Sequence, residues 1–214
     1  VGHASVYTGS VPSINGISGN NWFDNYTQKS VYCVDDNSVN SVGIDNSPAG
    51  KMSPVNLWTT TIGDELKIAT NFKSKVIGLS IKDRGAILPA GHSADGAFWY
   101  DSKSGNFISS TYYAKQLPSW VTNYNNQHRV DSLYSKGWNL SLAKSVYEAN
   151  CDQDENEYES TPLGKEQKAF PYSLSQFIGK DYGKIASTPW GNTILAELAE
   201  QAIVNENMGK DDIT

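Results

Sequence analysis

The residues with the clearest chemical potential are two cations, Lys82 and Arg84, which follow a run rich in β-branched residues at 75–81. If the loop is extended, both side chains project to the same side and Asp83 projects to the other. Arginine offers a planar fork of N–H donors and lysine a compact point charge, a combination that suits a small, multiply charged anion. The alternative is a solvated charged turn, because charged residues are common on loops.

A second candidate donor lies in a turn-rich segment near the N-terminus. Asn20 follows Gly19 within residues 11–24. Its side-chain amide could donate to an anion, or the residue could serve only as a turn former. The residues alone leave both readings open.

Catalytic patterns are missing from the sequence. The three histidines, His3, His92 and His128, lack the close spacing of zinc ligands, so each is expected to be a structural or surface residue. No Gly-x-Ser-x-Gly elbow occurs. Cys33 and Cys151 could form one disulfide or remain two thiols. From the residues alone, the chain is an anion-binding α/β lobe without chemistry of its own.

Composition narrows the class of partner. The chain has 214 residues, 23 acids and 17 bases, with a formal net charge of −6. This balance argues against a nucleic-acid partner, whose recognition needs a basic surface. No apolar run approaches membrane-spanning length, and no signal peptide is recognised at Val1. The length fits one domain or lobe, residues 1–214, and the abrupt start predicts an excised or processed piece.

The elements around Lys82 must place it at the edge of a sheet. Residues 75–81 are predicted to form a buried strand of a βαβ-type sheet, and such sheets bind ligands beyond the carboxyl ends of their strands. Ser53 and Pro54 resemble a helix start, and the helix is predicted to run to about Asn71. Its expected apolar face is Val55, Trp58, Ile62, Leu66, Ala69 and Phe72.

The remaining elements are predicted from local signals. A short helix is expected over 3–8, a strand near 30–34, a hairpin from 97–101 and 106–111, and a helix over 118–127. Residues 133–146 have a weaker apolar pattern with a turn at Trp138, and the acidic stretch 150–168 is expected to be a surface excursion rather than a calcium site. The last helix should start at 188–189 and end before Gly209, packing on the sheet through Ile194, Leu195, Leu198, Ala202 and Ile203.

Several motifs in order resemble one family. Residues 1–24 resemble the nucleophile helix and following loop of the alkaline phosphatase superfamily, in its nucleotide pyrophosphatase/phosphodiesterase-like branch. The segments 50–54, 82–85 and 88–95 narrow the likeness to the bacterial periplasmic alkaline phosphatases. The resemblance implies an α/β, alkaline-phosphatase-like fold, here an excised lobe with helices packed on a mixed sheet plus a β-hairpin insertion.

The resemblance also implies roles for three residues. Asn20 corresponds to an asparagine whose amide contacts a phosphoryl oxygen, and Lys82 and Arg84 to a Lys-x-Arg pair that contacts the phosphate oxygens of monoesters. The interval between positions 20 and 82, which is 62 residues, matches the family interval. Such donors stabilise charge on the transferred phosphoryl group.

By the same resemblance, the parent protein is a phosphate monoester hydrolase that uses two zinc ions and a threonine nucleophile. The threonine is expected two residues before Val1, and the motifs that carry the zinc ligands do not occur in the chain. The chain alone is therefore expected to hold no catalytic residue and no zinc and to be inactive. Residues 211–214 resemble the approach to the next ligand-bearing strand.

The implied setting is bacterial, periplasmic or secreted. The implied partners are small phosphate esters and the remainder of the parent catalytic domain, without nucleic acid or membrane. Two alternatives stay open: a phosphodiesterase or nucleotide pyrophosphatase, and a non-catalytic anion-binding module. A diester has one fewer anionic oxygen to neutralise, so the pair Lys82 and Arg84 favours monoesters.

Overall fold

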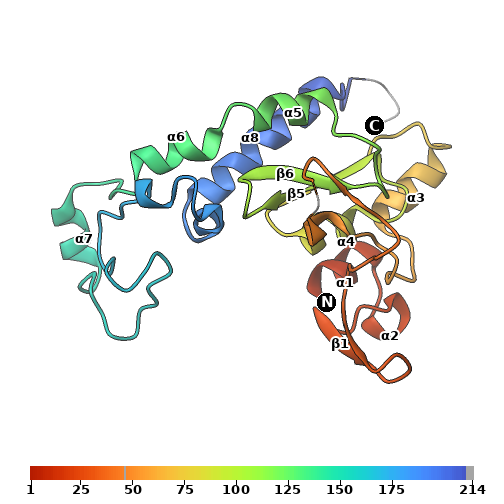
Figure 1. The fold of residues 1–214 in the computed structure, drawn as a ribbon, viewed down its shortest axis with the longest axis horizontal. Coiled ribbons are helices and arrows are strands. Elements are labelled where there is room, and N and C mark those ends of the chain that lie inside the picture. The colour runs from red at the N-terminus through yellow and green to blue at the C-terminus, as the bar shows by residue number, and fades with distance from the viewer. Residues whose placement is uncertain (46, 211–214) are drawn as a thin grey trace.

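A computed structural model describes residues 1–45 and 47–210 of the chain. Its centre is a four-stranded mixed sheet in the order β3-β6-β5-β4 (Figure 1). β4 pairs in parallel with β5, and the other neighbours are antiparallel. The strands span Ser41–Val42 (β3), Ile77–Ser80 (β4), Gly96–Asp101 (β5) and Asn106–Ser110 (β6). The predicted βαβ strand, the hairpin and the mixed sheet are confirmed.

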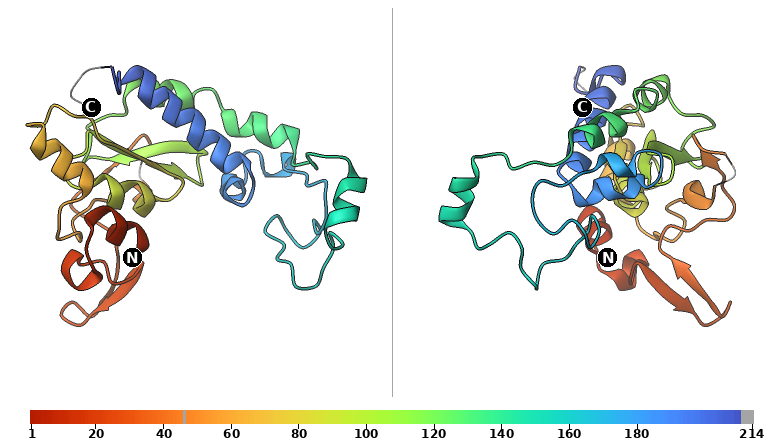
Figure 2. Two further views of the ribbon diagram at one scale, coloured as in Figure 1. Left: turned by 180° about the vertical axis from the view of Figure 1, so that it is seen from behind. Right: turned by 60° about the vertical axis from the view of Figure 1, so that its left-hand side comes forward.

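Helices cover both faces of the sheet. Successive side chains of β5 point to opposite faces, so the strand contributes to a core on each side. Phe98 and Tyr100 contact a core shared with α5, α6 and α8, whereas Ala97 and Trp99 contact a core shared with α1 and α4. Figures 1 and 2 show these helices on the two sides of the sheet. All of β5 is buried, as expected for a strand covered on two sides. These helices span Gly2–Thr8 (α1), Asp83–Ala90 (α4), Ser119–Asn125 (α5), Arg129–Lys136 (α6) and Trp190–Asn205 (α8).

A separate two-stranded hairpin precedes the main sheet. β1 (Asn21–Asp24) pairs antiparallel with β2 (Lys29–Tyr32), with Asn21 opposite Tyr32. β2 corresponds to the strand predicted near 30–34. β1 was not predicted, because the Gly- and Asn-rich residues before it indicated turns.

The helix predicted from Pro54 to Asn71 is only partly present. α3 spans Ile62–Ala69, and residues before it form turns. The Ser53 hydroxyl donates to Asp36 instead of opening a helix. Thr61 begins α3 through a capping box, in which its side chain accepts from the Asp64 N–H and Asp64 accepts from the Thr61 N–H. A true cap therefore lies eight residues after the predicted one.

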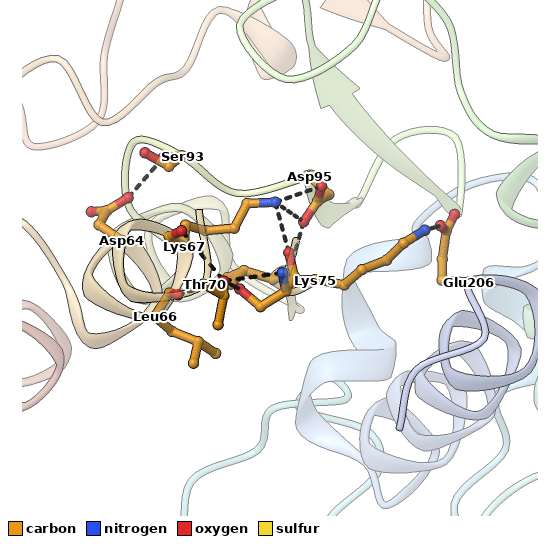
Figure 3. Close-up of polar contacts among 10 residues, drawn as sticks. Asp64, Leu66, Lys67, Thr70, Lys75, Ser93, Asp95 and Glu206 are labelled. Carbon is orange, nitrogen blue, oxygen red and sulfur yellow. Dashed lines mark hydrogen bonds and ion pairs between the residues drawn. The ribbon is translucent and has the colours of Figure 1, made fainter. Parts of the chain in front are cut away.

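The faces of α3 are opposite to the prediction. Ile62 and Leu66 are 69% and 37% exposed, while Asp64 and Lys67 are 1% and 4% exposed. Lys67 Nζ lies 2.8 Å from both carboxylate oxygens of Asp95 and 2.9 Å from the Ser74 carbonyl (Figure 3). Polar contacts, rather than the apolar stripe, hold α3 against the molecule.

The C-terminal helix follows the prediction more closely. Ile194, Leu198 and Ala202 of α8 are buried, and Leu195 is partly buried against the same core. Ile203 is 53% exposed, so it lies outside the apolar face. The helix also ends at Asn205 rather than at Met208, because Asn207 adopts a positive φ of 54° before Gly209 is reached.

The segment between α6 and α8 lies mostly at the surface. α6 ends at Lys136 with Gly137 as its C-cap, and Trp138 then pairs with Tyr172 in an isolated β-bridge. The intervening chain, which contains α7 (Lys144–Asn150), extends away from the body (Figure 2). Shorter elements are Pro12–Asn15 (α2), Pro48–Gly50 (η1), Ser175–Phe177 (η2) and Tyr182–Ser187 (η3).

Two questions left by the sequence concern cysteines and membranes. Cys33 is buried, Cys151 is exposed, and both are free thiols. Among the residues described, no helix combines the length and the apolar composition needed to cross a membrane. The expected approach to another strand at 211–214 lies outside the described residues.

Candidate functional site

The carboxyl end of β4 leads directly into α4, which places the two cations. Lys82 is the N-cap residue of α4, and Arg84 lies in its first turn. α4 packs closely on β4, because a Cβ atom at Gly78 would lie 2.3 Å from the Ala86 carbonyl oxygen. At Gly85 it would lie 2.4 Å from Ser80 Oγ. The two glycines thus permit the approach that fixes Lys82 and Arg84 beyond the strand.

The extended loop predicted for residues 82–84 is wrong. The chain turns into a helix at Asp83, so the two-residue alternation does not apply. Arg84 Nη1 donates to the Tyr32 hydroxyl at 2.9 Å, and that hydroxyl donates to Asp83 Oδ1 at 2.5 Å. Asp83 and Arg84 therefore meet at one tyrosine, whereas the sequence argument placed Asp83 on the opposite side from the cations.

The electrostatics of this contact keep Tyr32 neutral and Arg84 charged. Burial, reinforced by the hydrogen bond to Asp83, raises the pKa of Tyr32 well above its usual value. The hydrogen bond to Tyr32 raises the pKa of Arg84 further. At neutral pH the tyrosine is thus a neutral donor and the arginine a cation.

Asn20 lies at the base of the hairpin that carries Tyr32. The Asn20 carbonyl accepts from the Cys33 N–H at 2.9 Å, next to Tyr32 at the end of β2. The Asn20 residue is exposed. Contacts through the hairpin therefore link Asn20 to the start of α4, from a position 62 residues earlier in the chain.

The three predicted residues leave donors for a ligand. Lys82 is exposed and forms no ion pair within residues 1–45 and 47–210. In the same part of the chain, the Arg84 guanidinium donates only to Tyr32, through Nη1, and the Asn20 amide has no protein partner. The anion-binding role of these three side chains stays a prediction, with two charged donors and one neutral amide available for it.

Metal ligands do not gather in the part of the chain that the structure describes, where no three His, Cys, Asp or Glu side chains could hold an ion. His92, in the segment that resembled the family, has a structural role. Its Nε2 lies 2.9 Å from the Leu57 carbonyl oxygen and its Nδ1 3.4 Å from Asp64 Oδ2. It links the turn before α3 to the helix N-terminus.

Tyr32 is the residue that sequence reasoning missed. It lies 52 positions before Arg84, and nothing in its local sequence indicates a partner. The only usable signal in the sequence was that Tyr32 lies in a predicted strand that follows Asn20 closely along the chain.

Comparison with known proteins identifies the family. A model described as type I phosphodiesterase / nucleotide pyrophosphatase matches residues 1–170. The chain belongs to this family. Alkaline phosphatase PafA of Elizabethkingia meningoseptica is 48% identical over 100% of the chain and 39% of its own length. Alkaline phosphatase PhoV of Synechococcus elongatus is 50% identical over 98% of the chain and 38% of its length.

Solved structures of a member of the phosphodiesterase family agree with the fold. The crystal structure of wild-type alkaline phosphatase PafA has a TM-score of 0.95 and 48% identity, and the match covers 100% of the chain and 41% of that protein. A PafA variant with one Thr, one Asn, one Lys and one Arg substituted also has a TM-score of 0.95, at 46% identity and the same coverage. The expected family resemblance and fold class are confirmed, and the chain spans about two-fifths of its relatives' length.

Proposed function

We propose that the intact protein containing this chain hydrolyses phosphate monoesters as an alkaline phosphatase. The observation that carries the proposal is the pair Lys82 and Arg84 beyond the carboxyl end of β4, with cationic donors available to an anion. Membership of the phosphodiesterase family and the relatives named alkaline phosphatase support the same reaction class.

Asn20, Lys82 and Arg84 are the proposed substrate-binding residues. Above about pH 6 a phosphate monoester is mostly a dianion, and during transfer negative charge is spread over the three equatorial oxygens of the phosphoryl group. Two cations fit this charge better than the single negative charge of a diester. In the PafA variant, the substituted Asn and Lys are 62 positions apart and the Arg follows by two, which matches the spacing of these three residues.

The proposal assigns the nucleophile and the metal ions to parts of the family domain outside this chain. Within residues 1–45 and 47–210, no three His, Cys, Asp or Glu side chains could together hold an ion. Two zinc ions and a threonine nucleophile, as the family resemblance implies, would act together with the phosphate donors of this chain. The proposed share of residues 1–45 and 47–210 is to bind and orient the phosphoryl group.

The remainder of the catalytic domain is the proposed partner. The two cores lie on opposite faces of one sheet, which supports residues 1–214 as a single lobe of that domain. Ile62 and Leu66, four residues apart on α3, form an exposed apolar face, and β4 lies at the edge of the sheet. An apolar face and an open sheet edge are surfaces that a neighbouring lobe would cover.

A periplasmic or secreted location is proposed from the relatives of the chain. The relatives are bacterial alkaline phosphatases. Cell fractionation checks it: the proposal requires the protein in the periplasm or medium, and recovery in the cytoplasm only would contradict it.

A phosphodiesterase is the second candidate, since the family description includes one. A diester carries a single negative charge, so its binding depends less on the two cations Lys82 and Arg84. The third possibility, a non-catalytic anion-binding module, predicts phosphate binding without turnover by the intact protein.

The deciding experiment compares an aryl phosphate monoester with the matching methyl aryl diester, using the intact, zinc-loaded protein. Monoester kcat/KM should exceed diester kcat/KM, and Arg84→Ala should lower the monoester value by about a hundredfold, as loss of one preorganised donor does elsewhere. The diester value should change by less than about threefold on the same argument. A preferred diester, or an unchanged ratio in Arg84→Ala, would refute the assignment.

A further inference from the structure

We infer that Tyr32 is a positioning residue that orients Arg84 toward the phosphoryl group. The inference rests on the proposed function of Arg84 and adds a residue to it. Its observation is the bridge in which Arg84 Nη1 donates to the Tyr32 hydroxyl and the hydroxyl donates to Asp83 Oδ1.

The direction of the two hydrogen bonds is fixed by chemistry. A guanidinium can only donate, so the Tyr32 oxygen accepts from Arg84 and its one proton is left for Asp83. Asp83 Oδ1 also accepts from the Arg84 backbone N–H at 2.6 Å, which holds the carboxylate at the first turn of α4. Each member of the bridge therefore has one defined role.

The bridge preserves the binding capacity of Arg84. A direct fork between Arg84 and Asp83 would occupy two parallel N–H donors, which are the donors that a phosphate also uses. No Arg84–Asp83 ion pair occurs in the described part of the chain, and the tyrosine takes a single Nη1 contact instead. The remaining guanidinium donors stay available while the side chain is held.

The position of Tyr32 also couples two proposed phosphate donors. Tyr32 ends β2, and the next residue donates its N–H to the Asn20 carbonyl. The same hairpin therefore places Asn20 and restrains Arg84. The ring of Tyr32 lies 6.0 Å from the Arg84 guanidinium carbon, which adds a weak cation–π contact.

The test uses Tyr32→Phe in the intact, zinc-loaded protein, because this variant keeps the ring and removes the hydroxyl. Tyr26→Phe is the matched control, since Tyr26 is 99% exposed in the turn of the same hairpin. Asp83→Asn is a second variant that weakens the acceptor of the bridge. Equal urea midpoints of the variants and the parent protein establish that each variant is folded.

For Tyr32→Phe we expect a loss of about tenfold in monoester kcat/KM and no change for the diester, as expected when one charged hydrogen bond is lost. Tyr26→Phe should change neither value. In an Arg84→Ala background, Tyr32→Phe should have no further effect, because the residue that it positions is gone.

Three outcomes would overturn the inference: equal losses for both substrates, no loss at all, or a Tyr32→Phe effect that persists in the Arg84→Ala background. All three are distinguishable from failure of the proposed function. That failure appears as an unchanged monoester-to-diester ratio in Arg84→Ala alone, whereas the inference about Tyr32 fails with the Arg84→Ala effect intact.

Discussion

α3 and α8 show how the same sequence pattern can lead to opposite packing. Both helices have apolar residues at helical spacing, yet α8 buries Ile194 and Leu198 while α3 exposes Ile62 and Leu66. α8 packs against the sheet and two other helices, so the hydrophobic effect orients it. α3 is oriented by Asp64 and Lys67 with their polar partners, and its apolar face is exposed.

An apolar stripe on a helix therefore indicates that the helix packs against another surface. It does not indicate which part of the protein provides that surface. The chain spans about two-fifths of the length of its relatives. Within the described residues, the apolar face of α8 is buried and that of α3 is exposed. Substitutions on the two helices should therefore differ in their effect on stability.

The largest effect is expected from Leu198→Ala in α8. The side chain is 0% exposed, so its removal leaves a cavity in the core. The free energy of unfolding should fall by about 2–5 kcal/mol, as for other buried leucines. Urea unfolding of the 214-residue chain measures this. A loss below about 1 kcal/mol would mean that α8 does not pack as described.

Lys67→Met in α3 should have the next largest effect. Lys67 is nearly buried and pairs with Asp95, which is partly exposed (Figure 3). Removing the cation leaves Asp95 and the Ser74 carbonyl without their donor, so the free energy of unfolding should fall by about 2–3 kcal/mol, reduced from a fully buried pair by the exposure of Asp95. Lys73→Met, at an exposed position nearby, is the control and should change it little. Equal effects of the two substitutions would contradict a polar anchor for α3.

Acid should weaken α3 through Asp64. Burial opposes ionisation, but hydrogen bonds from Thr61, Ser93 and His92 outweigh it and lower the pKa of Asp64. A carboxyl whose pKa is lower when folded stabilises above its unfolded pKa of about 3.9, and this contribution is lost as pH falls through the folded pKa.

Urea midpoints at pH 7 and pH 3 measure this prediction. Asp64→Asn should destabilise the chain at pH 7, and the gap to the parent chain should narrow at pH 3, because the parent then loses the carboxylate contribution. A gap of constant size at both pH values would show that the charge of Asp64 has no part in the anchor.

The smallest effect is expected from Ile62→Ala. The side chain is 69% exposed in the described structure, so the unfolding free energy of the 214-residue chain should change by less than about 0.5 kcal/mol. In the intact protein, where a neighbouring lobe is proposed to cover α3, the same substitution should cost more. Equal, small losses in both proteins would contradict that coverage.

The sequence predicted elements with strong local signals and missed those that depend on distant partners. The hairpin around Gly105 and the stripe of α8 follow from short-range patterns; the hairpin is confirmed, and so is the stripe apart from the exposed Ile203. The start of α3 was placed at Ser53 because Ser-Pro resembles a cap. The real cap at Thr61 is an exception, because its partner Asp64 lies only three residues later, and it was missed in favour of the earlier Ser-Pro pair.

The same limit applies to the site. Lys82 and Arg84 were placed correctly after β4, because position after a strand is a local property. The orientation of Asp83 was wrong, because the chain enters α4 at this residue, and its partner Tyr32 is 51 residues away along the chain. Long-range hydrogen bonds of this kind leave no periodic trace in a single sequence.

The most direct test of the account is a crystal structure of the intact protein with bound inorganic phosphate. The account predicts phosphate oxygens within about 3.2 Å of nitrogen atoms of Asn20, Lys82 and Arg84, the range of a hydrogen bond, with Tyr32 still bridging Arg84 and Asp83. A phosphate bound with all three side chains beyond hydrogen-bonding distance would contradict it.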